Sequence, residues 1–210
     1  MKTAVQPRAL KTRARILRAA TRLFTAKGYH DTKLDDIRRA AKVTTGAFFH
    51  HFTGKEDLGF AVLDHYLDER GSELDQVERE LFPVPSADPL ERVFERVQAT
   101  RHRFARRMRS KQAGCIFGNF STTLCETHAG FRRRLAECFD AMALDFKVRL
   151  DEAVARHRPG QAIDTMALAR YLISILEGSI ILARVHQDDG LLARHFQLFE
   201  DDLRRSLSRS

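Results

Sequence analysis

Helical periodicity runs through almost every segment of this 210-residue chain and constrains its fold more than any other feature. Between Leu10 and Lys27, apolar residues such as Ile16, Leu17 and Ala20 recur three and four positions apart, which places them on one face of a helix. Gly28 is expected to end that helix. Comparable patterns predict further helices near residues 55–81, 89–110, 114–126, 130–157, 162–185 and 190–207. The sequence therefore predicts an all-α fold.

The segment from residue 32 to residue 52 predicts two short helices joined by a tight turn. Thr32 followed by Asp35 is similar to a capping box and predicts the start of the first short helix. Thr44 is suited to cap the second short helix, which we expect to run from about Thr45 to His51. Two short helices joined in this way are typical of a helix-turn-helix.

Positive charge is concentrated around these short helices. Residues 1–55 hold 13 Lys and Arg against 3 Asp, whereas residues 56–210 carry a net charge of −2 and the whole chain +8. Phosphate attraction supplies affinity for DNA and a helix supplies base contacts, so a basic unit with paired helices suits the major groove. A basic balance alone would fit RNA or a membrane surface equally well. We predict two domains, a DNA-binding domain at 1–55 and a helical body at 56–210.

The cysteines and the apolar segments indicate the cellular compartment of the protein. Three cysteines, at positions 115, 125 and 138, form neither an even set nor a metal-type spacing, which favours a reducing compartment. The N-terminus has no apolar core of the secretory type. The most apolar stretch, residues 163–185, contains four charged residues, which argues against a membrane span. We predict a cytoplasmic protein with no membrane partner.

The run from Thr12 to Leu58 resembles the TetR family of bacterial transcriptional regulators, of the TetR/AcrR type. The matching pieces agree in order and spacing over about a quarter of the chain: Arg15-Ile16-Leu17, Ala19-Ala20, Leu23-Phe24, Gly28-Tyr29, Thr32, Asp36-Ile37, Ala40-Ala41, Val43, Thr45-Gly46-Ala47-Phe48, His51-Phe52 and Lys55-Glu56-Asp57-Leu58. The resemblance implies a three-helix DNA-binding domain followed by a helical domain that binds a ligand and forms a dimer.

The resemblance also implies that the third helix enters the major groove. Thr44 and Thr45 are short donors and acceptors at its N-terminal end, where side chains reach base edges, and a contact from Thr44 would be additional to its capping. Gly46 allows a close approach there, and His50 reaches a base or a phosphate. Lys33 and Lys55 are candidate phosphate contacts at the starts of the second and fourth helices.

Phe49 departs from the family pattern, which usually has Tyr at this position with a hydroxyl that commonly contacts the DNA backbone. Phenylalanine can pack or touch a thymine methyl, but it cannot donate a hydrogen bond. The resemblance therefore implies only an apolar contact between Phe49 and DNA.

The predicted body supports a homodimer. Residues 171–183 are apolar nearly all round, so one flank needs a cover beyond the core of its own domain. Two such helices from each subunit, at 162–185 and 190–207, would form a four-helix interface around a two-fold axis. The alternative is that they only close a monomeric core.

A ligand pocket is predicted from the chemistry of the body. The candidate pocket residues are Phe104, Cys115, Phe120, Met142, Phe146 and Glu177. Aromatic and Met side chains at helical spacing also fill cores. A carboxylate such as Glu177 on an apolar helix must reach solvent, pair with an arginine, or line a cavity that suits a cationic or hydrogen-bonding ligand. The basic run Arg101, Arg103, Arg106, Arg107, Arg109 and Lys111 is expected to be a solvated face.

Residues 114–120, Gly-Cys-Ile-Phe-Gly-Asn-Phe, are similar to a segment of a TetR subgroup that senses reactive electrophiles through the cysteine in that position. Cys115 lies near a predicted helix N-terminus and follows basic residues, both of which would lower the pKa of a thiol. We hypothesise a reactive Cys115; the alternative is a buried, inert residue.

Enzymatic function is not indicated. The chain contains none of the Gly-x-Ser-x-Gly, phosphate-loop, Gly-x-Gly-x-x-Gly or His-Glu-x-x-His motifs, and Cys125 with His128 offers too few ligands for a metal site. We predict no cofactor, no metal and a ligand-responsive regulator. Its predicted partners are a palindromic double-stranded DNA operator and a small-molecule inducer, and its predicted action is repression. The alternatives are a basic nucleic-acid-binding protein without an inducer and an enzyme with no recognisable motif.

Overall fold

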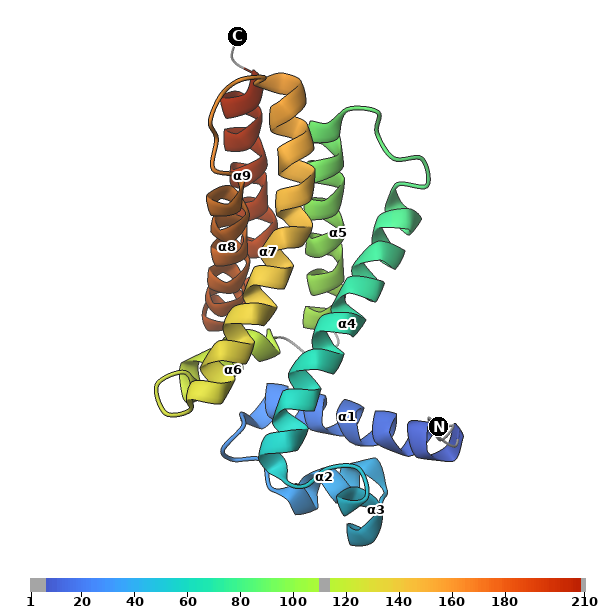
Figure 1. Cartoon of the computed structure of the whole chain (residues 1–210). Helices are drawn as coiled ribbons and strands as arrows, with labels where there is room; N and C mark the ends of the chain where they lie inside the picture. The colour runs from blue at the N-terminus through green and yellow to red at the C-terminus, as the bar shows by residue number, and fades with distance from the viewer. Residues whose placement is uncertain (1–6, 110–113, 209–210) are drawn as a thin grey trace. The chain divides into compact units, whose positions relative to one another are not determined.

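The computed structural model describes residues 7–109 and 114–208, and the regular secondary structure of these residues consists of α-helices (Figure 1). The prediction of an all-α fold is confirmed. The helices are α1 (Pro7–Lys27), α2 (Leu34–Ala41), α3 (Thr45–Phe49), α4 (Lys55–Leu81), α5 (Pro89–Arg109), α6 (Ile116–Leu124), α7 (Ala129–His157), α8 (Thr165–His186) and α9 (Leu191–Ser208).

The chain forms two compact units, and each contains segments that are distant in sequence. The first unit combines the chain up to Asp68 with Ile116–Leu135, and the second combines Glu69–Cys115 with Ala136–Ser210. Helices α4 and α7 therefore contribute residues to both units. The proposed division into domains at 1–55 and 56–210 is a different partition, because it assigns α6 and the start of α7 to the body.

Local sequence signals set several helix ends in the first unit as predicted. Gly28, with φ of +83°, follows the last residue of α1 and its N–H donates to Phe24 O at 3.0 Å. The Thr44 side chain accepts a hydrogen bond from the N–H of Ala47 and caps α3. Helix α3 ends at Phe49, with His50 at its C-cap, so it is slightly shorter than predicted.

Thr32 does not cap α2, and the prediction of a capping box at this position is wrong. Lys33 occupies the N-cap and makes no side-chain cap hydrogen bond. Thr32 is instead fully buried, and its hydroxyl donates to Gly28 O at 2.7 Å, close to the end of α1. A threonine hydroxyl can hydrogen-bond the backbone at the end of one helix or at the start of the next. Because Thr32 is buried, its hydroxyl bonds the end of α1.

Aromatic rings join α6 and the start of α7 to the rest of the first unit. The Phe120 ring meets the Phe24 ring at 5.5 Å and the Phe131 ring at 5.8 Å, both edge-on. Phe60 of α4 stacks on Phe131 at 4.3 Å. Asn119 adds a hydrogen bond to the carbonyl oxygen of Thr25 at 3.1 Å. Segments that are far apart in sequence thus share one core.

Helices of the second unit are built around a separate apolar core. Asp88 Oδ1 accepts a hydrogen bond from the N–H of Leu90 at 2.9 Å, and Pro89 opens α5. Helix α8 buries one stripe, with Leu172, Leu176 and Ile180 each at most 3% exposed. Packing of such stripes supplies most of the stability of helices in a bundle.

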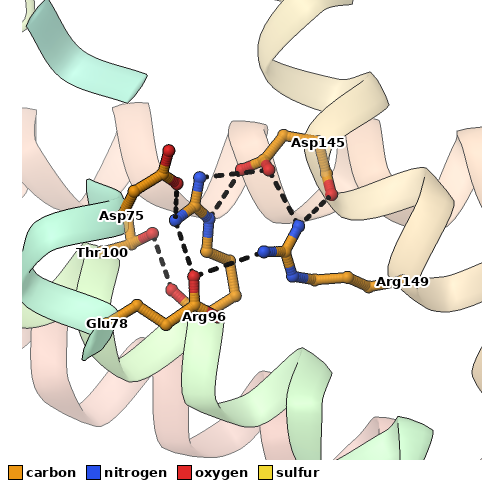
Figure 2. A network of polar contacts seen from close by, with 6 residues as sticks. All are labelled: Asp75, Glu78, Arg96, Thr100, Asp145 and Arg149. Atoms are coloured by element: carbon orange, nitrogen blue, oxygen red, sulfur yellow. Dashed lines mark hydrogen bonds and ion pairs between the residues drawn. The ribbon is translucent and has the colours of Figure 1, made fainter. Parts of the chain in front are cut away.

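A buried arginine ties three helices of the second unit together (Figure 2). Arg96 of α5 is 3% exposed and donates to both carboxylate oxygens of Asp145 on α7, at 2.8 and 3.1 Å. Its Nη1 donates to Asp75 at 3.0 Å and to Glu78 at 2.8 Å, both on α4. Arg149 bridges Glu78 and Asp145. Burial by itself would lower the pKa of Arg96, but the carboxylates outweigh it and raise that pKa, so Arg96 stays charged.

Helix α8 also carries an exposed apolar stripe. Tyr171, Ile181, Leu182 and Val185 are 53%, 56%, 42% and 71% exposed, and Leu198 on α9 is 64% exposed. By length and composition alone α8 could cross a membrane, although core helices of soluble proteins pass the same test. These side chains form an exposed apolar surface over α8 and α9.

Candidate DNA-binding surface and body site

The N-terminal end of α3 presents its polar groups to solvent. Thr44, Thr45 and Gly46 are all exposed. Arg38 of α2 donates a hydrogen bond to Thr45 Oγ1 and also pairs with Asp35 at 2.8 Å. This hydroxyl oxygen accepts from Arg38, and its own O–H remains available as a donor. A base edge with an acceptor, such as N7 of a purine, matches that donor.

The remaining predicted residues of α3 lie on the same short element. Phe49 is 52% exposed, whereas its neighbour Phe48 is fully buried and meets it edge-on at 5.3 Å. His50 is exposed at the C-cap. His51 is partly buried, and burial together with His50 and Arg13 lowers the pKa of His51. About half of the Phe49 side chain is therefore open to solvent.

Lys55 opens α4 and is held in a defined position. Its Nζ donates to the carbonyl oxygen of His30 at 3.1 Å and lies 4.6 Å from the centroid of the Tyr29 ring. Burial lowers the pKa of Lys55, against a smaller opposing effect of Asp31. Lys33, at the N-cap of α2, is exposed. Helix N-termini attract anions, so both lysines stand where a phosphate would be favoured.

A basic groove of about 320 Å³ lies between α1 and the end of α2. Three alanines form part of its lining, and its charged residues are Arg15, Arg18, Arg22 and Lys42. Arg15 donates to Ala41 O and Lys42 O, which caps the C-terminal end of α2. These charges raise the positive potential of the first unit in addition to the predicted contacts.

Glu177 is the predicted body residue with the most constrained surroundings. Its Oε1 is buried and has no hydrogen-bond partner among the described residues. The carboxyl accepts a hydrogen bond from the Cys115 thiol and lies in the field of Arg70, which is 3% exposed. Burial raises the pKa of Glu177, and Cys115 and Arg70 oppose this only in part. The arrangement leaves one carboxyl oxygen that can bind a donor.

The other predicted pocket residues are buried but divided between the two units. Phe104, Met142 and Phe146 are at most 2% exposed in the second unit, whereas Phe120 belongs to the first unit. A second groove of about 380 Å³, lined by residues of α5 including Arg101 and by the end of α4, contains none of the predicted pocket residues.

The expectation of a solvated basic face on α5 is wrong for Arg103. Its side chain is 3% exposed and pairs with Glu73 of α4 at 2.6 Å. Arg106 pairs with Glu80 at 3.3 Å and is exposed. Lys111 and the side chain of Arg109 lie outside the described residues. The sequence pattern does not predict the burial of Arg70. This residue shows in the sequence only as a charge within an otherwise regular apolar pattern of α4.

Among residues 7–109 and 114–208, no group of three or more His, Cys, Asp or Glu could hold a metal ion. His128 instead accepts a hydrogen bond from the N–H of Phe131 at the start of α7, and its Nε2 lies 3.2 Å from Glu56.

Comparison with known families decides the identity. A family model described as bacterial regulatory proteins of the tetR family matches residues 16–62, and one described as a tetracyclin repressor-like C-terminal domain matches residues 89–199. The chain belongs to the TetR family. It is therefore a DNA-binding transcriptional regulator and not an enzyme, with α2 and α3 as its helix-turn-helix.

Relatives of this TetR-family regulator match along most of their length. The transcriptional regulator AcuR of Cereibacter sphaeroides is 28% identical over 190 residues, which cover 86% of this chain and 83% of that protein. The HTH-type transcriptional repressor DhaR of Mycobacterium sp. strain GP1 is 25% identical over 84% of each chain. A solved TetR regulatory protein from Rhodobacter sphaeroides has a TM-score of 0.75 and 26% identity, covering 90% of this chain and 96% of that one.

Proposed function

We propose that this regulator represses transcription by binding a palindromic operator as a homodimer, and that a small molecule or reactive compound releases it. The observation that carries the proposal is the exposed, Thr44-capped N-terminus of α3 in a strongly basic unit, in which the Lys55 ammonium is held by His30 O. The name of DhaR, a repressor, supports negative regulation.

In this proposal base edges are read by Thr44, Thr45 and Phe49, with Gly46 leaving room for the DNA. Among the residues that the structure describes, no non-neighbouring atom lies within 4 Å of the position that a Cβ at Gly46 would take. Thr45 donates from a hydroxyl that is oriented by Arg38, and Phe49 offers an apolar face to a thymine methyl. His50, Lys33 and Lys55 contact the backbone phosphates, which fix the register of the helix without reading sequence.

Dimerisation is assigned to the exposed stripe of α8 and α9. The stripe comprises Tyr171, Ile181, Leu182, Val185 and Leu198. A two-fold axis would bury this stripe against its own copy. Two recognition helices would then face successive major grooves, which lie about 34 Å apart, so the operator half-sites are expected one helical turn apart.

The inducer site is assigned to Glu177 and Cys115, with Phe104, Met142 and Phe146 as candidate apolar walls. The free Glu177 Oε1 suits a ligand with an N–H or O–H donor. A reactive Cys115 remains a prediction; its thiol is 3% exposed and donates to a carboxyl. Mass spectrometry after mild electrophile treatment tests it, and the absence of an adduct at Cys115 would end the hypothesis. We further assign the protein to the cytoplasm, where the DNA partner lies.

A gel-shift titration tests the DNA contacts, using the DNA between the gene for this regulator and its neighbour. Lys55→Ala is expected to weaken binding to every sequence and to lower the salt slope by about one unit. Thr45→Ala is expected to relax the preference at particular base pairs and to leave the slope unchanged. If the wild-type protein ignores every promoter fragment at low salt, or sediments as a monomer, the proposal fails. Binding with no sequence preference would support a basic nucleic-acid-binding protein instead.

A further inference from the structure

Tyr29 lies in the loop between α1 and α2, and its ring carries the Lys55 ammonium. The Nζ of Lys55 is 4.6 Å from the centroid of this ring, within the range of a cation–π interaction. The same Nζ donates to the carbonyl oxygen of His30 at 3.1 Å. An ammonium has three donors, so this arrangement occupies one and leaves the others for a further acceptor.

The Tyr29 ring is itself fixed from several directions. It packs against Phe24 of α1 at 5.3 Å, Phe120 of α6 at 5.3 Å and Phe131 of α7 at 5.4 Å. Helix α4 contributes Gly59, where an added Cβ would lie only 3.1 Å from the ring. Burial, with a smaller effect of Glu56, raises the pKa of Tyr29 to about 12, so its hydroxyl is neutral at ordinary pH. The Tyr29 ring is thus held by packing on several sides and forms a platform for the Lys55 ammonium.

A free lysine side chain loses conformational entropy when its ammonium becomes fixed on a phosphate. A platform that orders the ammonium before DNA arrives removes part of that cost from binding. We propose that Tyr29 is a positioning residue that holds the Lys55 ammonium ready for a backbone phosphate of DNA. This inference rests on the proposed phosphate contact of Lys55 and adds the residue that makes the contact effective.

The test is the salt dependence of binding to a mixed-sequence DNA duplex between about 50 and 200 mM salt, the range over which phosphate contacts dominate affinity. The slope of log K against log salt is negative, and each lost contact reduces the size of this slope by about 0.9. We expect Tyr29→Leu and Lys55→Ala each to lower it by about that amount, and the double variant to lower it no further. Tyr29→Phe keeps the ring and is expected to keep the slope.

Tyr66→Leu is the matched control. Tyr66 is a buried tyrosine of the same unit, 1% exposed, whose ring meets Phe117 at 5.1 Å. This substitution costs core packing without removing the Lys55 platform, so the slope is expected to stay at the wild-type value. If it falls as far as in Tyr29→Leu, Tyr29 acts only through core packing and the inference is wrong.

Two further outcomes would overturn the inference. One is a wild-type slope in Tyr29→Leu, and the other is additive losses in the double variant with Lys55→Ala. Should Tyr29→Leu fail to fold, proton NMR of the wild-type protein decides instead: the Lys55 ε-methylene signals are expected upfield of their random-coil position because of the ring current, and unshifted signals would refute the platform. Failure of the wild-type protein to bind duplex DNA at low salt would refute the proposed function, and is distinguishable from all of these.

Discussion

Replacing Arg96 with methionine removes the cation at the centre of the network that joins α4, α5 and α7 (Figure 2). Methionine keeps most of the apolar stem of the side chain, so the change is mainly one of charge and hydrogen bonding. Three carboxylates, Asp75, Glu78 and Asp145, then lose the guanidinium that each of them contacts.

The magnitude follows from how exposed those carboxylates are. Removing one partner of a buried ion pair costs about 3–5 kcal/mol because the other charge stays buried and uncompensated. Glu78 and Asp145 are only 20% and 23% exposed but keep Arg149, whereas Asp75 is 54% exposed and can be hydrated. We therefore expect a loss near the lower end, about 3 kcal/mol of unfolding free energy.

The assay is urea unfolding followed by circular dichroism, at one fixed protein concentration because association with a second subunit contributes to stability. Arg92→Met is the matched control: Arg92 lies on the same helix and pairs with Glu152, but the two side chains are 32% and 53% exposed. That pair is expected to contribute about 0–1 kcal/mol. If Arg96→Met costs no more than Arg92→Met, the reasoning from burial is refuted.

Three other substitutions probe burial, close packing and the Thr32 hydroxyl. Burial raises the pKa of Glu177, so the folded state takes up protons there and loses stability as pH rises above the unfolded value; Glu177→Gln should unfold at higher temperature than wild type at pH 7 but not at pH 4. Gly59→Ala places a Cβ 2.8 Å from the Phe131 ring and should cost about 1–3 kcal/mol in urea unfolding. Thr32→Val removes the buried donor to Gly28 O and should cost about 1–2 kcal/mol in the same assay.

Each of these has a control on an exposed or open position. Glu126 is exposed, and a gain in Glu126→Gln equal to that in Glu177→Gln would contradict the role of burial. Gly71→Ala lies on the same helix as Gly59 with nothing within 4 Å, so it should stabilise by about 0.5–1 kcal/mol; a stabilising Gly59→Ala would refute the close contact. Thr122 is exposed. A loss of unfolding free energy in Thr122→Val as large as that in Thr32→Val would contradict the hydrogen-bond argument.

Local signals in the sequence were enough for the helices and for the position of α3. Gly28 and Thr44 each act on backbone groups within four residues, and the structure places both as predicted. The charge contrast between residues 1–55 and the rest is likewise a property of composition alone. These features need no knowledge of distant partners.

Where a side chain could find partners at two places in the fold, the sequence pattern does not predict which partner it contacts. Thr32 satisfies the end of α1 and not the start of α2. Arg103 looked like one more cation on a basic face, yet its helix position turns it inward to Glu73. Glu177 was noticed as a lone carboxylate, but Cys115 and Arg70 as its neighbours could not be deduced from spacing. Each outcome depends on which groups are buried together.

The sequence by itself therefore determined an all-helical regulator with a basic helix-turn-helix, because helix periodicity, caps and net charge are carried by neighbouring residues. Only the tertiary structure decided that Tyr29 supports Lys55, that α6 shares a core with α1, and that Arg96 binds carboxylates from two other helices. These contacts join residues far apart along the chain, and they exist only after folding has excluded water from between them.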